Sequence, residues 1–315
     1  MDQFPPLQTK VSPSRQFFIL LGLVSLGFLL ASFVSIIAIL VIPGASPEAV
    51  VSADPSMAGL MQWLQVASTL CIFLIPVLLF KLIVHPSGDY LKFKKRSSFI
   101  IWLIVIGLAL SAIPTADLLT SLTEHIPISA ALKTRFEQME EQYNSQMLLM
   151  LQLDSFSGYL KSLILIALLP AVFEELLFRG CLQQIMLKWT QKTLPAILIT
   201  SIIFSAIHGS YFGFLPRVFI GLLLGYVFFY GRNIWLNMLI HFINNGMIIT
   251  VLYYQNLRTG SIKEALKSQT STPLGFIGLV ALILLFVYFI KLCRRQSISK
   301  NDQNQPVNPN PLSNS

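Results

Sequence analysis

Three short motifs place carboxylate, imidazole and amide side chains inside otherwise apolar segments of the sequence. In chain order they contribute Glu174, Glu175 and Arg179, then Phe204 and His208, then His241 and Asn245. Insertion scales put the cost of a central Asp or Arg in a membrane-spanning helix at about 2.5–3.5 kcal/mol. Two adjacent glutamates in an apolar helix therefore point to a functional site.

The residue types in these motifs could together hydrolyse an amide bond. Glu174 with His208 could orient and deprotonate a water molecule. His241 and Asn245 could donate hydrogen bonds to the oxyanion of a tetrahedral intermediate. Glutamate and histidine from different helices could also bind zinc, with Glu174, His208 and His241 as the candidate ligands. The HExxH signature of soluble zinc proteases is absent from the sequence, so the cofactor stays open at this stage.

The spacing within the first motif predicts which side chains share a helix face. Glu175 and Arg179 are four positions apart, so they should meet as an ion pair with the glutamate first. Glu174 is rotated by about 100° from Glu175 and is therefore free for another partner. A buried ion pair can also hold helices together without a catalytic role, and the sequence leaves both interpretations open.

Composition indicates a membrane protein. Of the 315 residues 54% are hydrophobic and 11% are charged, whereas soluble domains carry about 25% charged residues. The net charge of +8 comes from Lys and Arg beside apolar runs rather than from a basic patch with interleaved aromatics, so nucleic acid is not an expected partner. The cysteines Cys71, Cys181 and Cys293 are isolated from one another, which argues against a disulfide framework and a zinc knuckle.

A membrane-spanning helix needs about 20 mostly apolar residues. Eight ranges meet this requirement: 17–43, 59–84, 98–119, 159–189, 194–209, 211–230, 233–254 and 273–291. We therefore predict an all-α fold, a polytopic bundle of transmembrane helices. The expected organisation is a cytoplasmic segment at 1–16, a transmembrane domain at 17–292 with its motif core at 159–254, and a disordered polar tail at 293–315.

Positive charges fall on alternate loops. They occur in 85–97, near residue 190, at Arg232 and after the last span, whereas 44–58 has none. This bias predicts that both termini are cytoplasmic. One loop disagrees, because it carries Arg258, Lys263 and Lys267 on the opposite side. The acidic segment 120–158 should leave the membrane, with an amphipathic surface helix around 132–153.

Depth along the helices decides whether the motifs can meet. If the fourth helix continues past Arg179 and turns at about 190–193, it pairs antiparallel with the fifth. Residues at equal depth on two antiparallel helices are equally far in sequence from the turn that joins them. Glu174 and His208 are equally far from residue 191, because (174 + 208)/2 = 191, so each would lie roughly 25 Å from the turn. His241 and Asn245 would lie roughly 15–21 Å above the turn near 231. The sequence thus predicts one polar layer built from three helices.

The motif set resembles the CPBP family of membrane peptidases, which includes eukaryotic CAAX prenyl endopeptidases and bacterial bacteriocin-processing or immunity proteins. The matching pattern is Glu174-Glu175-x-x-x-Arg179-Gly180, Phe204-x-x-x-His208 and His241-x-x-x-Asn245. The resemblance implies an intramembrane endopeptidase in which Glu174 and His208 activate water. It implies His241 and Asn245 as oxyanion stabilisers or further polar ligands, with Glu175 and Arg179 as a supporting ion pair.

The same resemblance sets the expected surroundings of the protein. The partners would be the lipid bilayer and a peptide or protein substrate, which could be prenylated or bound to the membrane. The expected location is the bacterial cell membrane, as a multi-pass integral protein. Zinc remains a candidate cofactor, because the motifs do not decide between a metal and an unaided glutamate.

Two other functions are compatible with the sequence. Intramembrane Glu and His clusters also mark ion and proton pathways, although we find no paired repeats with broken helices, which many transporters show. A non-catalytic immunity or binding protein on the same scaffold is the other alternative. The retention of every motif residue disfavours it.

Two features outside the motifs also receive an interpretation. Arg217 follows Pro216 near a helix start and is interpreted as an interfacial anchor without a chemical role. Gly221 and Gly225 are four positions apart, which predicts close packing between helices rather than a site.

Overall fold

The computed structural model describes residues 10–52, 54–86, 88–94, 96–260 and 272–303. Within these ranges the chain forms helices and no strand, which confirms the predicted all-α fold. The elements are α1 (Pro13–Val41), α2 (Pro47–Val51), η1 (Pro55–Met57), α3 (Ala58–Thr69), η2 (Leu70–Leu74), α4 (Ile75–Val84), α5 (Phe99–Glu124), α6 (Ala130–Met150), α7 (Phe156–Ser162), η3 (Leu163–Leu168), α8 (Leu169–Leu177), η4 (Phe178–Leu182), α9 (Gln183–Thr190), α10 (Thr193–Ala206), α11 (Phe214–Gly231), α12 (Ile234–Thr259) and α14 (Thr272–Gln303). The segment η1 is a 3₁₀ helix, and η2, η3 and η4 are π-helical.

Among the described residues, six helices are long and apolar enough to cross a membrane. They are Pro13–Val41, Pro55–Val84, Phe99–Glu124, Phe214–Gly231, Ile234–Thr259 and Pro273–Gln296. The remaining two predicted spans are helical as well: 194–209 corresponds to the shorter apolar helix α10, and 159–189 to the run from α7 to α9. The chain is thus an integral membrane protein, and the count of eight crossings stays a prediction.

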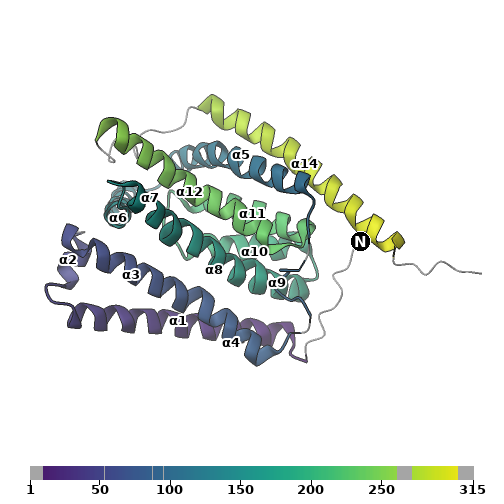
Figure 1. Ribbon diagram of the computed structural model, residues 1–315, viewed down its shortest axis with the longest axis horizontal. Coiled ribbons are helices and arrows are strands. Elements are labelled where there is room, and N and C mark those ends of the chain that lie inside the picture. Colours follow the sequence, from purple (N-terminus) through teal and green to yellow (C-terminus); the bar gives the residue numbers. More distant parts are fainter. Residues whose placement is uncertain (1–9, 53, 87, 95, 261–271, 304–315) are drawn as a thin grey trace, which may run out of the picture.

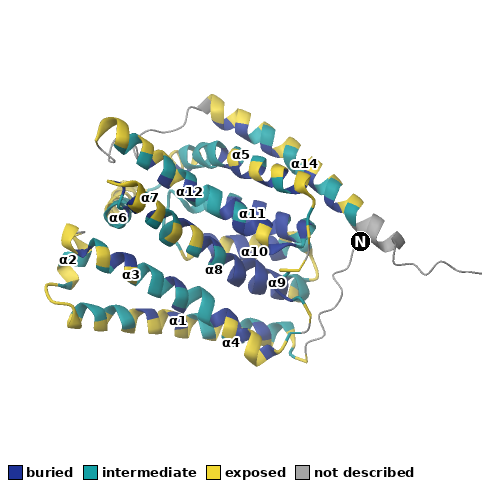
Figure 2. Ribbon diagram, viewed as in Figure 1, coloured by how far each residue is buried: buried dark blue, intermediate teal, exposed yellow. Residues whose placement is uncertain are grey.

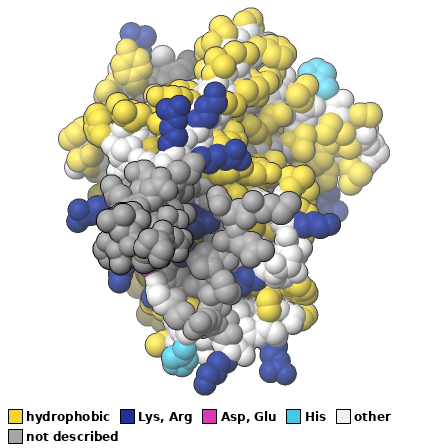
Figure 3. All heavy atoms as spheres, turned by 90° about the vertical axis from the view of Figure 1, so that its right-hand side faces the viewer, with side chains coloured by type: hydrophobic (Ala, Val, Ile, Leu, Met, Phe, Trp, Pro, Cys, Tyr) yellow, Lys and Arg dark blue, Asp and Glu magenta, His cyan; other side chains and the backbone are white. Residues whose placement is uncertain are grey.

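The long helices lie side by side, and one end of the bundle collects the basic connections (Figure 1). At this end the backbone N–H of Ile234 donates to the carbonyl of Lys92 (3.2 Å), and the Gln184 amide donates to the carbonyl of Tyr90 (2.8 Å). Helix α1 begins and α14 ends here (Figure 1). Figure 3 looks at this end and shows Lys and Arg side chains spread over it.

The opposite end of the bundle carries α6. There the Gln62 amide donates to the carbonyl of Met150 (2.6 Å), and the Asn256 amide donates to the carbonyl of Leu153 (3.1 Å). Helix α6 covers most of the range predicted as a surface helix and has no buried residue. The acidic segment therefore lies at the end away from the basic connections.

Helix α14 extends beyond the predicted end of the transmembrane domain at residue 292. Cys293 is buried, and the guanidinium of Arg294 lies 5.7 Å from the ring centre of Tyr230 on α11. These contacts prolong the helix, so 293–303 is helical rather than disordered as predicted. The rest of the predicted tail, residues 304–315, lies outside the described residues. So do Lys263 and Lys267 of the loop that disagreed with the charge pattern.

Burial separates an outer layer of helices from an inner one (Figure 2). The outer helices α1 and α14 expose large apolar side chains, including Leu40 at 78% and Leu284 at 66%. The inner helices α8, α9 and α11 each bury half or more of their residues. Outward apolar side chains of this extent suit a hydrocarbon environment, while the polar motifs lie on the inner helices.

The helix that carries the first motif is a composite. Segments α7, η3, α8, η4 and α9 follow one another without a break from Phe156 to Thr190, and the chain then turns at Gln191 with a left-handed φ of 54°. Helix α10 starts at Thr193 and runs back beside α9 and η4. The predicted continuation past Arg179 and the turn near 190–193 are both confirmed.

Helices α10 and α11 approach closely at two glycines. A Cβ at Gly221 would lie 2.8 Å from the Cβ of Ser201, and a Cβ at Gly225 would lie 2.4 Å from Cγ2 of Ile197. Both glycine carbonyls also accept side-chain hydrogen bonds, from Arg179 (3.2 Å) and Gln183 (2.9 Å). The predicted close packing is confirmed, and it brings α11 against the first-motif helix.

Replacing Gly225 by alanine is expected to destabilise the bundle by about 1–3 kcal/mol, the usual cost of overpacking a tight site. Gly22, also helical, has no atom within 4 Å of its Cβ position, so Gly22→Ala should change stability by less than about 0.5 kcal/mol. Unfolding in mixed detergent micelles, followed by circular dichroism, measures both variants. Equal stability of the two variants would contradict the importance of this contact.

Candidate active site

Glu174 lies at the centre of the constellation predicted from the motifs. It is 7% exposed, and its Oε2 atom lies 3.9 Å from Nε2 of His208 and 3.8 Å from Nε2 of His241. Within the described part of the chain this oxygen has no hydrogen-bond partner. The prediction that Glu174 and His208 lie at the same depth is therefore confirmed, and His241 joins them from α12.

Glu175 forms a separate, fully buried network one residue further along α8. Its Oε1 atom accepts hydrogen bonds from Nη1 of Arg179 (2.7 Å) and from Nδ1 of His241 (2.8 Å). Arg179 also donates through Nη2 to the carbonyl of Gly221 (3.2 Å). The predicted ion pair is present. The contact between Glu175 and His241 was not predicted, because helical spacing shows neighbours within one helix and not across two.

The hydrogen bonds at Nδ1 determine what the two imidazoles present to Glu174. Nδ1 of His208 lies 2.7 Å from the carbonyl of Phe204, and a carbonyl only accepts, so this nitrogen carries the proton. Nδ1 of His241 likewise donates to the Glu175 carboxylate that is already paired with Arg179. In the neutral imidazoles both Nε2 atoms therefore present lone pairs toward Oε2 of Glu174. Three acceptor atoms converge, an arrangement complementary to a water molecule or another proton donor.

Phe204 packs against this cluster from α10. Its ring centre lies 5.1 Å from that of His208 and 5.7 Å from that of His241, and the guanidinium carbon of Arg179 lies 4.9 Å from it. The residue is 3% exposed. The aromatic residue of the second motif thus limits the movement of both imidazoles and of the ion pair.

Asn245 lies one turn beyond His241 on α12 and is partly buried. Its Oδ1 accepts a hydrogen bond from the amide of Asn244 (3.4 Å). No contact with Glu174, His208 or His241 is recorded for it in the described residues. The structure therefore brings together three of the four predicted catalytic side chains and leaves Asn245 beside them on the same helix.

All seven motif residues fall within one stretch that corresponds to a known family. Residues 156–247 match the family described as type II CAAX prenyl endopeptidase, Rce1-like. The chain contains an Rce1-like segment. The segment runs from α7 into α12. Its match to the family confirms the resemblance to membrane peptidases that the motifs indicated. Neither a curated protein nor a solved structure matches the chain significantly.

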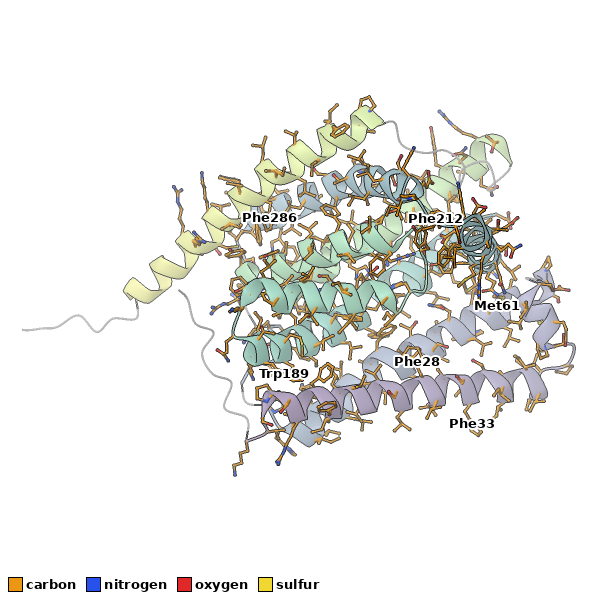
Figure 4. The ribbon with its side chains drawn as sticks, turned by 180° about the vertical axis from the view of Figure 1, so that it is seen from behind. Phe28, Phe33, Met61, Trp189, Phe212 and Phe286 are labelled. Atoms are coloured by element: carbon orange, nitrogen blue, oxygen red, sulfur yellow. The ribbon has the colours of Figure 1, made fainter. Side chains whose placement is uncertain are left out.

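A cavity of about 240 Å³ adjoins the Rce1-like segment at His208. Helix α6, which precedes that segment, forms one wall of the cavity, and the loop after α10 forms another. Two contacts join these walls: Oγ of Ser210 donates to Glu140 (2.8 Å), and the rings of Phe136 and Tyr211 stack at 4.4 Å. Figure 4 shows α6 end-on, with Phe212 of the same loop beside it. The polar cluster thus has a cavity at the end of the bundle opposite the basic connections.

The loop between α10 and α11 of the Rce1-like segment is fixed by short contacts. Gly209 takes a left-handed φ of 63°, and Oγ of Ser205 donates to the carbonyl of Phe214 (2.7 Å). Oγ of Ser210 accepts from the backbone N–H of Gly213 (2.9 Å). These bonds tie His208 to the start of α11.

Arg217 in the first turn of α11 is a further cation near the site. A Cβ built on Gly213 would meet both its Nη1 atom and Oγ of Ser210, which lines the cavity. Its Nη1 atom is buried without a hydrogen-bond partner in the described structure, the residue as a whole is partly exposed, and its role as an interfacial anchor stays a prediction. One feature of the sequence could have indicated that Arg217 lies near the site. It is an arginine inside an apolar helix, nine positions after the motif histidine His208 (217 − 208 = 9).

The residues predicted as zinc ligands have suitable donor atoms but a wide spacing. Two ligand atoms on a tetrahedral zinc ion, each about 2.0–2.1 Å from it, lie about 3.3–3.4 Å apart. Oε2 of Glu174 is 3.8 and 3.9 Å from the two Nε2 atoms. Across the described ranges no group of three or more His, Cys, Asp or Glu side chains is placed to hold a metal ion.

Proposed function

We propose that this protein is an intramembrane endopeptidase of the CAAX-processing type. The observation that carries the proposal is the convergence of Glu174, His208 and His241 beside a cavity, within an Rce1-like segment of an apolar helix bundle. A buried carboxylate oxygen without a partner is costly unless a ligand or a water molecule completes it. Three acceptors around one point are suited to hold and polarise a water molecule.

Hydrolysis would proceed with Glu174 as general base. A water molecule that donates one hydrogen to Glu174 and the other to the Nε2 lone pair of His208 loses a proton to the carboxylate as its oxygen attacks the scissile carbonyl carbon. The π electrons of that carbonyl move to its oxygen and form an oxyanion. When the tetrahedral intermediate collapses, the C–N bond breaks and Glu174 returns its proton to the leaving amine. The products are a peptide with a new carboxylate and a peptide with a new amine.

The other motif residues would position the His241 imidazole and stabilise the oxyanion. Glu175 and Arg179 fix the orientation of His241 through its Nδ1 proton, as a carboxylate does in many catalytic histidine pairs. When Nε2 of His241 is protonated as well as Nδ1, the resulting imidazolium lies between two carboxylates and could direct its Nε2 proton at the oxyanion. Asn245 could add a second donor from the next turn of α12.

The cavity suggests how a substrate reaches the site. Its walls include Phe136 and Tyr143 of α6 together with His208, so an extended peptide could lie between α6 and the loop after α10. Such a peptide would place its backbone next to the polarised water.

Cleavage of a library of lipidated and plain peptides by the purified protein in detergent tests this proposal. We expect the wild type to cleave at least one peptide and the His208→Ala variant to lose that activity by about 100-fold or more. His125 is a matched control, because its Nδ1 also contacts the carbonyl four residues earlier (2.7 Å), but the residue is exposed. His125→Ala should therefore cleave like the wild type.

The outcomes separate the competing functions. Equal cleavage by wild type and His208→Ala would remove His208 from the mechanism. Failure of the wild type to cleave any peptide would favour an immunity or binding protein on the same scaffold. Proton flux across liposomes that depends on Glu174 would favour a proton relay. Elemental analysis of the same samples would show whether one zinc ion per protein is bound and is lost with His208→Ala.

A further inference from the structure

The cavity beside His208 has an acidic and aromatic lining. Its volume is about 240 Å³. Cavities that hold drug-sized ligands measure about 300–1,000 Å³, so this one suits a single side chain of a bound peptide. The described residues that line it include a carboxylate and three aromatic rings but no Lys or Arg, and these four are Glu140, Phe136, Tyr143 and Tyr211. The lining therefore favours a positively charged ligand over a negatively charged one.

Glu140 brings an unpaired negative charge to the cavity. The residue is partly buried on α6, and no ion pair within 4.0 Å is recorded for it in the described ranges. Its Oε2 atom accepts one hydrogen bond, from Oγ of Ser210 (2.8 Å), whereas an ionised carboxylate has about four acceptor sites. Arg217 lies near Ser210 across Gly213, but it does not line the cavity. Most of the acceptor capacity of Glu140 is therefore available to a ligand.

The aromatic side chains of the lining also suit a cation. The face of an aromatic ring attracts positive charge, and the stacked rings of Phe136 and Tyr211 each keep one face that the other does not cover. Oη of Tyr211 is buried without a hydrogen-bond partner in the described structure, and a phenol oxygen can accept from an N–H group. Met139 and Tyr143 add apolar surface for the methylene stem of a long basic side chain.

His208 connects the cavity to the reacting groups. It lines the cavity, and its Nε2 atom lies 3.9 Å from Oε2 of Glu174. Successive residues of an extended peptide are about 3.3–3.6 Å apart along the chain. A peptide whose scissile bond lies at Glu174 would therefore place in the cavity a side chain from the cut itself or from the next residue along.

We propose that this cavity binds a basic side chain of the substrate, a lysine or arginine beside the scissile bond, with Glu140 as its counter-charge. This inference rests on the proposed peptidase function and names a feature of its substrate. A lysine or arginine has an apolar stem and a head that only donates hydrogen bonds, which matches a lining of rings and acceptors. An apolar side chain would instead cover the Glu140 carboxylate and the Tyr211 hydroxyl without a partner, which is costly. An acidic side chain would meet a like charge.

Peptide binding to the Glu174→Gln protein, which should not cleave, tests the subsite separately from catalysis. The probes are dansylated octapeptide amides of alternating leucine and alanine, with lysine, norleucine or glutamate as the fourth residue. Norleucine keeps the four-carbon stem of lysine without its charge. Fluorescence anisotropy in a neutral detergent should show the lysine peptide binding about tenfold more tightly than the norleucine peptide, the effect of one charge-assisted interaction. The net charge of +8 on the protein would by itself favour the glutamate peptide, so long-range attraction cannot produce this preference.

The Glu140→Gln substitution in the same background should bring the lysine and norleucine peptides within about twofold of each other, because the amide carries no charge. Its carbonyl oxygen can still accept from Ser210, so the contact between α6 and the loop after α10 is kept. Glu140→Lys should reverse the preference and favour the glutamate peptide. Glu137, three positions earlier on α6, is exposed and does not line the cavity, so Glu137→Gln and Glu137→Lys should both keep the lysine preference.

The outcomes distinguish the subsite from the peptidase function. Equal binding of the lysine and norleucine peptides to the Glu174→Gln protein, or a lysine preference that survives Glu140→Gln, would overturn the subsite. Tighter binding of the norleucine peptide would assign the cavity to an apolar side chain instead. In wild-type assays, mass spectrometry of the products should locate the cut at the lysine or one residue away, and cleavage indifferent to the lysine would remove the subsite alone. A lysine preference in a protein that cleaves nothing would leave the subsite standing and remove the peptidase function.

Discussion

Replacing Glu174 by glutamine is expected to lower kcat/KM by about 1,000-fold or more, within the range that general-base catalysis provides. The amide has nearly the same size and shape as the carboxylate, but it cannot take a proton from water. Oε2 of Glu174 has no hydrogen-bond partner in the described structure, so removing its charge should not weaken the fold. The helix content and the unfolding midpoint of Glu174→Gln should therefore equal or exceed those of the wild type.

Steady-state kinetics on any peptide cleaved by the wild type measures this loss. Glu137 on α6 is exposed, and Glu137→Gln makes the same chemical change away from the imidazoles, so it should keep wild-type kcat/KM within about twofold. A loss smaller than tenfold in Glu174→Gln would assign the general base to another group. A parallel loss of helix content would show that Glu174 supports the fold instead.

The largest effect on stability is expected at Arg179. Removing one partner of a buried ion pair leaves the other charge uncompensated and typically costs about 3–5 kcal/mol. Arg179→Met would leave the carboxylate of Glu175 with only His241 as a donor, and it would leave the carbonyl of Gly221 without its side-chain donor. Glu175→Leu would leave the guanidinium with Gly221 alone. Both single variants are expected to unfold far more readily than the wild type.

The double variant Arg179→Met with Glu175→Leu is expected to be more stable than either single variant, because both charges are removed together. Unfolding by a denaturing detergent in mixed micelles gives the free energies of unfolding of the wild type, the two single variants and the double variant. These four values form a double-mutant cycle. Single losses below about 1 kcal/mol, or a double variant as unstable as the sum of the singles, would contradict a coupled pair. Activity should be lost in the two variants that lack Glu175, because His241 then loses the acceptor that orients its Nδ1 proton.

Much of the site was predictable, because it depends on helical geometry. The turn at Gln191 follows from the need to bring Glu174 level with His208, and four-residue spacing predicts the pair of Glu175 with Arg179. Depth counting also placed His241 in the same layer. These predictions succeeded because rise and rotation per residue vary little within helices.

Other features depend on contacts between helices and have no local signal. The bond between His241 and Glu175 requires the rotation of α12 about its axis, which the sequence does not state. The π-helical segment η4 changes the rotation between Arg179 and Gln183 without changing the hydrophobicity of the segment. The helical continuation of α14 past residue 292 arises from packing against α11, whereas a polar composition alone predicts disorder.

The cavity beside His208 and the basic connections lie at opposite ends of the bundle. If the basic end faces the cytoplasm, as the loop charges predict, the water that is consumed enters from the outer side of the membrane. A protein made in the cytoplasm could then be cut only after the segment around its scissile bond had crossed the bilayer. Export would therefore precede cleavage, and the order of these two events, rather than the affinity of the site, would separate secreted or surface-exposed substrates from the other proteins of the cell.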